Sequence, residues 1–87
     1  MESNGFTVNV FDLKTGLTVY ENASYVRITS KDYNLLIMLD YIPIIGELQG
    51  KVDIKTNEGE LHFENIIASY MNSNNVFNLM IQGEINE

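Results

Sequence analysis

The only histidine of the chain, His62, stands between two acids at the spacing of one strand face. Glu60 precedes it by two residues and Glu64 follows it by two, and side chains at i±2 share one face of a β-strand. An imidazole between two carboxylates could bind a metal or take part in acid–base chemistry. A metal site, however, needs convergent ligands held by supporting contacts, which one strand does not supply. We therefore expect a solvated strand face here.

Other catalytic patterns are missing from the sequence. The serines stand in no G-x-S-x-G motif, and the glycines are isolated, so no phosphate-binding loop is formed. The acids lack the spacing of a calcium loop. We predict a non-catalytic protein with no cofactor and no metal.

The charge of the chain restricts its partners. The net charge is −7, and the five basic residues are scattered among acids. Phosphate backbones and anionic lipid surfaces require clustered Lys and Arg, so we predict no nucleic-acid partner and no insertion into a membrane. The absence of cysteine and of an N-terminal signal segment predicts a cytoplasmic location.

Most of the chain has the short periodicity of strands. Phe6, Val8 and Val10 alternate with polar residues, and Val52 and Ile54 alternate with charged ones. A continuous apolar run, Leu35 to Leu39, predicts a strand covered on both faces. The predicted strands cover residues 6–11, 17–20, 25–29, 35–39, 51–56, 61–64, 66–71 and 76–81, with a short apolar strand between Pro43 and Gly50.

Turn signals separate these strands at regular intervals, and no segment has a convincing helical period. The sequence therefore predicts an all-β fold, a two-layer antiparallel β-sandwich of about 8 to 10 short strands. Residues 1–87 form a single domain, because the chain is too short for two.

The only proline marks a corner that could serve as a docking surface. Pro43 lies between two apolar runs, and proline belongs at an edge or a turn because it has no N–H donor. Ile42, Pro43, Ile44 and Ile45 form an apolar ridge, with Tyr41 beside it and Tyr70 as a further aromatic anchor. Burial of this ridge in the core is an equally open alternative.

The order of these motifs resembles the N-terminal domain of the epsilon subunit of F-type ATP synthases. The run from Tyr33 to Ile44, followed by Leu48 and Gly50, resembles the family's G-E-L-G-I-x-P-G-H-A-P-L segment, and residues 68–79 resemble a later conserved segment. The resemblance extends over residues 6–82. It implies a non-catalytic central-stalk subunit of a rotary ATPase that docks on the gamma shaft and couples ATP turnover to rotation, without the inhibitory C-terminal helices.

By the same resemblance, the contact with a gamma-like shaft falls on Ile42, Pro43, Ile44, Ser69 and Tyr70. The loops that face the membrane rotor ring correspond to Asn34, Asp40 and Tyr41, where the family has an acid, a glycine and a histidine. These departures suggest a specialised F1-like motor, from a bacterium with a reduced genome, that does not drive the usual ring. The complex would place the protein at the periphery of the cytoplasmic membrane.

Two other functions remain open from the residues. A free-standing β-sandwich could bind a small ligand or a peptide, and its thermal midpoint would then rise with a metabolite rather than with an ATPase subunit. An enzyme dependent on His62 is the third possibility, and replacing His62 with Ala without loss of function would exclude it.

Overall fold

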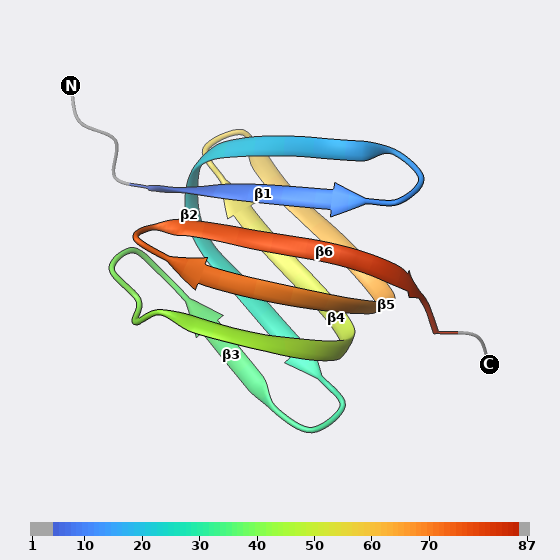
Figure 1. Ribbon diagram of the computed structural model, residues 1–87. Coiled ribbons are helices and arrows are strands. Elements are labelled where there is room, and N and C mark those ends of the chain that lie inside the picture. The colour runs from blue at the N-terminus through green and yellow to red at the C-terminus, as the bar shows by residue number, and fades with distance from the viewer. Residues whose placement is uncertain (1–4, 86–87) are drawn as a thin grey trace.

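The computed structural model describes residues 5–85, which form six β-strands and no helix (Figure 1). The strands are β1 (Phe6–Asp12), β2 (Gly16–Ser30), β3 (Asn34–Ile37), β4 (Ile44–Thr56), β5 (Gly59–Ser73) and β6 (Val76–Glu84). The all-β prediction is therefore confirmed.

Five of the strands close into a barrel in the order β1-β6-β5-β4-β2, with β2 pairing back onto β1. Every neighbouring pair of the barrel is antiparallel except β1 and β6, which run parallel from Thr7 opposite Val76 to Asp12 opposite Ile81. The remaining strand, β3, pairs with the second half of β2. Figure 1 shows β1 and β6 side by side, although they are the first and last strands of the chain.

The closed barrel corrects the prediction of a two-layer sandwich of many short strands. β2, β4 and β5 are 13 to 15 residues long, and each contains a bend that the sequence presents as a break between two strands. The bends lie at Asn22, Gly50 and Asn65, all with positive φ, next to bulges in the pairing register. Bulges bend and twist a strand locally, so each long strand curves around the barrel.

Glycine is required at one of these bends. Gly50 has φ of 156°, and a Cβ atom there would clash with the carbonyl oxygen of Thr29 on β2. The close approach lies where β4 meets β2: β4 pairs with β5 alone over residues 44–49 and pairs with β2 as well over residues 50–56.

The inward face of each strand supplies the barrel core. Phe6, Val8 and Val10 are buried as predicted from their alternation, and so are Val52 and Ile54. The other buried apolar side chains come from strands β2 to β6: Ala23, Val26, Ile28, Ile37, Leu48, Ile66, Ala68, Tyr70, Phe77, Leu79 and Ile81. This core fixes which face of each strand is outward, and therefore where a partner can bind.

The apolar run Leu35–Leu39 is not covered on both faces, contrary to the prediction. Ile37 is buried and Leu35 packs on the core, but Leu36, Met38 and Leu39 are exposed. The reason is that β3 lies outside the closed barrel, so no other strand of the described residues covers its second face. Its outward apolar residues are left available for contact.

Candidate functional site

The predicted corner is an exposed loop between β3 and β4, which we call the elbow (residues 38–43). The side chain of Ile42 is 68% exposed, and Met38, Leu39 and Pro43 are exposed too. The elbow does not fold into the core. It is an apolar surface feature, as the docking hypothesis requires.

Side chains of the β5–β6 hairpin hold the elbow in place. The backbone N–H of Asp40 donates to Oδ1 of Asn75 at 2.7 Å, and Nδ2 of Asn75 donates to the Asp40 carboxylate at 3.1 Å. Nδ2 of the buried Asn72 donates to the carbonyl of Ile42 at 3.4 Å. The elbow is therefore tied to a second part of the chain by defined contacts.

The ridge that follows Ile42 is divided by strand alternation. Ile44 is half-buried and packs on the core, while Ile45 is 76% exposed on the outer face of β4. The sequence left open whether this ridge is a docking surface or part of the core. In the structure Ile44 belongs to the core, and Ile42, Pro43 and Ile45 lie on the surface.

Tyr70, expected as a surface anchor, is a core residue with only 4% of its surface exposed. Its ring stacks on Phe77 with centroids 5.9 Å apart, and its hydroxyl lies 2.9 Å from the hydroxyl of Tyr33. Burial raises the pKa of Tyr70, and the hydrogen bond with Tyr33 raises it further. The side chain is a neutral structural group that cannot reach a partner.

The remaining predicted contact residues are spread over three regions. Asp40 and Tyr41 lie in the elbow beside Ile42 and Pro43, with Tyr41 half-buried against the core. Asn34 lies at the opposite end of β3. Ser69 is on the outer face of β5, where it accepts a hydrogen bond from Gln82 at 2.9 Å. The structure thus unites the elbow residues and leaves Asn34 and Ser69 apart from them.

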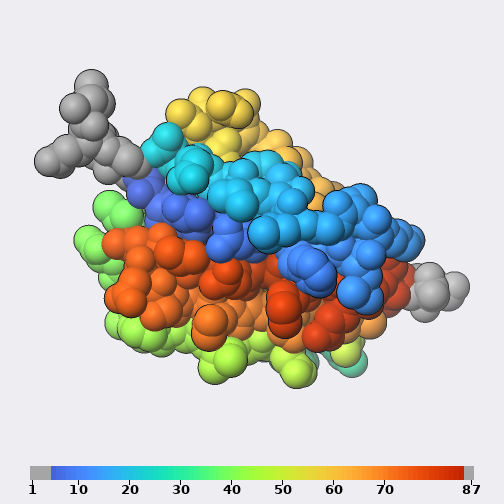
Figure 2. Space-filling view, turned by 45° about the horizontal axis from the view of Figure 1, so that its top comes forward, coloured from blue at the N-terminus to red at the C-terminus, as the bar shows by residue number. Residues whose placement is uncertain are grey.

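An apolar groove on the outer face was not predicted from the sequence. We call it the wall groove; it has a volume of about 410 Å³, and its exposed apolar residues are Phe11, Leu17, Ile45, Met71 and Met80. Figure 2 shows the side of the molecule on which β1 (blue) and β6 (orange to red) lie together. The five residues come from five strands, so only the pairing register could have shown their proximity.

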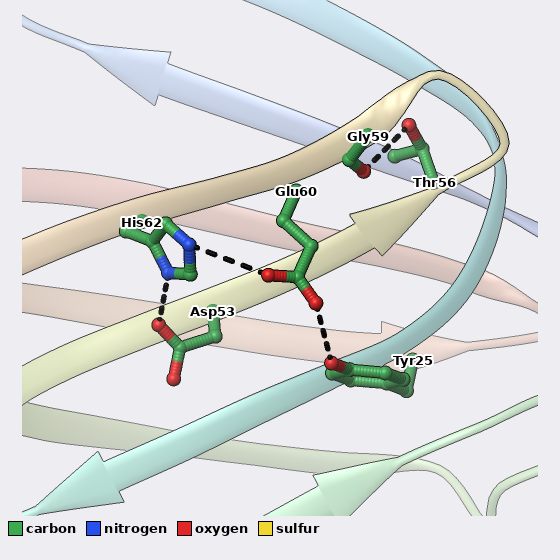
Figure 3. Close-up of polar contacts among 6 residues, drawn as sticks. All are labelled: Tyr25, Asp53, Thr56, Gly59, Glu60 and His62. Atoms are coloured by element: carbon green, nitrogen blue, oxygen red, sulfur yellow. Dashed lines mark hydrogen bonds and ion pairs between the residues drawn. The ribbon is translucent and has the colours of Figure 1, made fainter.

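A polar cluster surrounds His62 on the other side of the barrel (Figure 3). Nδ1 of His62 lies 2.7 Å from Asp53, which is directly opposite it on β4, and Nε2 lies 3.5 Å from Glu60. Tyr25 of β2 donates to the second oxygen of Glu60 at 3.2 Å. The hydrogen bond with Asp53 raises the pKa of His62, although its partial burial acts in the opposite direction.

This cluster is a network of exposed hydrogen bonds rather than a convergent site. Within residues 5–85, no group of three or more His, Asp or Glu side chains is placed to hold a metal ion. The sequence pattern identified Glu60 and Glu64 as neighbours of His62, but it missed Asp53, because cross-strand partners depend on register.

Comparison with known proteins provides no family assignment, since no family model and no curated protein matches the chain. In the described part of the chain, no helix has the length and apolar character needed to cross a membrane.

Proposed function

We propose that this protein is a non-catalytic adaptor of an F-type or F-type-derived rotary ATPase, which docks on a gamma-like shaft through the elbow. One observation carries the proposal: the segment that resembles the family's Pro-containing run forms an apolar loop that is exposed and held in place. The barrel differs from the family's sandwich, so the proposal rests on the order of motifs and on this surface.

The docking surface differs from the set of residues that the resemblance implied. Ile42 and Pro43 are its centre, and exposed Met38 and Leu39 extend it. Tyr70 contributes only by supporting the barrel beneath. Exposed apolar groups that are held in one conformation bind with a smaller entropy cost than mobile ones, and the Asp40–Asn75 pair supplies this restraint.

The proposal is tested by co-purification of the tagged full chain with neighbouring ATPase subunits. Ile42→Asp should abolish recovery of the gamma-like subunit, because it places a charge at the centre of the apolar contact. Leu13→Asp is the matched control, because Leu13 is equally exposed (74% against 68%) but lies in the β1–β2 turn. Co-purification should survive this change.

Two results would contradict the proposal: failure of any ATPase subunit to co-purify with the unaltered chain, or equal loss with both variants. A specialised motor that lacks the usual membrane ring is the narrower form of the proposal. Recovery of that ring with the complex would exclude the narrower form only.

A second function is favoured by the wall groove. A free-standing barrel could bind a small ligand or a peptide in an apolar depression of about 410 Å³, which lies within the usual size range of ligand sites. In that case the thermal midpoint would rise with the ligand and would not respond to ATPase subunits.

A further inference from the structure

The wall groove has an uncharged floor and an acidic border. All ten residues that line it are uncharged. On one side Glu47 follows Ile45 on the outer face of β4, opposite Ser69 of the groove. Glu21 of β2 accepts a hydrogen bond from Thr7 of β1, which precedes the lining residue Asn9 by two positions on the same face of β1.

Basic side chains are concentrated away from this groove. Strands β1 and β6 contain no Lys or Arg, and Lys14 is confined to the turn beyond Asp12. The other four basic residues belong to the second half of β2, the turn after it and the second half of β4: Arg27, Lys31, Lys51 and Lys55. A ligand in the wall groove therefore meets an apolar floor with acids beside it.

The centre of the groove offers no free strand edge to a ligand. Eight of its ten lining residues lie on β1, β5 and β6, which each pair with a neighbour on both sides, so an extended peptide that covers them could not add to the sheet there. Ile45 and Leu17, on the flanking strands β4 and β2, lie on segments that pair on one side. A segment that binds must satisfy its own backbone hydrogen bonds. An α-helix does this and presents side chains alone.

The methionines of the groove suit such a contact. Met71 and Met80 are both about half exposed, and the flexible thioether side chain adapts to the shape of an apolar partner. A second copy of the chain is a poorer partner, because its net charge of −7 would oppose association.

We propose that the wall groove binds an amphipathic helix of a partner protein, with apolar residues on one face and Lys or Arg beside them. The apolar face would cover Phe11, Ile45 and Met80, and the cations would lie near Glu21 and Glu47. This site is independent of the rotor proposal, because no elbow residue lines the groove.

The probe is a synthetic helix of about five turns with Leu on one face and Lys on the other, titrated into the full chain and followed by fluorescence anisotropy. A helix with Glu in place of Lys is its charge control. Met80→Lys should weaken binding by about tenfold or more, because it puts a cation in the apolar floor. Met38→Lys adds the same charge at an equally exposed elbow position (51% against 48%) and should leave binding unchanged.

Nuclear magnetic resonance spectra of both variants check that the barrel is intact. Equal binding of the Lys and Glu helices would overturn the proposal, as would equal binding by the two Met variants. Formation of a dimer by the unaltered chain, lost in Met80→Lys, would also overturn it and would assign the groove to a second copy. Failure of the elbow test above would leave these results unaffected.

Discussion

Gly46 lies where the backbone of β4 passes against the buried ring of Tyr70. A Cβ atom at this position would meet the Tyr70 hydroxyl at 2.5 Å and Cζ at 2.7 Å. The Tyr70 ring cannot move away easily, because its hydroxyl is hydrogen-bonded to the Tyr33 hydroxyl and its face stacks on the Phe77 ring. The absence of a side chain here is therefore a packing requirement.

Gly46→Ala should lower the free energy of unfolding by about 1 to 3 kcal/mol, the usual cost of overpacking a well-packed core. Gly83→Ala is the control, since a Cβ there has no neighbour within 4 Å, and it should be nearly neutral. Urea denaturation measures both. Equal stability of the two variants would show that the core around Tyr70 is less rigid than the structure indicates.

The hydrogen bond between His62 and Asp53 should make stability depend on pH. Because it raises the pKa of His62 in the folded chain, the protonated form is favoured by folding. The contribution is fully present below the unfolded-state pKa of about 6.5, and it is lost as pH rises through the higher folded value.

Asp53→Asn should lower the pKa of His62 toward its ordinary value, measured by proton resonance titration of the imidazole. Asp32→Asn, in the turn between β2 and β3, removes an equal charge without touching His62 and should leave that pKa almost unchanged. If both substitutions shift the pKa alike, general charge rather than the paired carboxylate is responsible.

At the scale of elements, the β5–β6 hairpin does more than reverse the chain. Its two turn residues, Asn74 and Asn75, both have positive φ, as two-residue hairpin turns of the primed type require. Asn75 also holds the elbow through Asp40. One residue thus serves both the turn and the proposed docking surface.

Asn75→Gly should separate these two roles, because glycine keeps the positive φ but loses the side-chain amide. We expect the Asp40 amide proton to exchange roughly fivefold faster, which corresponds to the loss of a hydrogen bond of about 1 kcal/mol. Asn74→Gly preserves both the turn and the Asp40 contact and should leave the exchange rate unchanged. Hydrogen exchange followed by nuclear magnetic resonance distinguishes them.

The strands themselves were largely predictable, but their continuity was not. Alternation placed Val8, Val52 and Ile54 inward correctly, because burial on one face leaves a period of two. Asn22 and Asn65 look like ends of strands in the sequence, since asparagine favours turns. In the structure they are bends inside β2 and β5, and only the pairing with other strands reveals this.

In the molecule as a whole, the pairing register of the closed barrel determines contacts that the sequence alone does not show. The contact of His62 with Asp53 and the assembly of Phe11, Ile45 and Met80 depend on which residues lie opposite each other. A shift of register by one residue would move each side chain to the other face. The exposure of the elbow was predictable in part, because Pro43 has no N–H to donate to a neighbouring strand. The burial of Tyr70 was not, because it depends on the position of this residue within β5.

The parallel pairing of β1 with β6 also determines how the molecule bears mechanical force. A pull applied to the start of β1 and the end of β6 drives these neighbours past each other along their length. The slanted, evenly spaced hydrogen bonds between them would then resist this shear force together, rather than breaking one after another. A tether at these two positions should make the barrel a stiff mechanical link, and this property would suit a component that transmits torque.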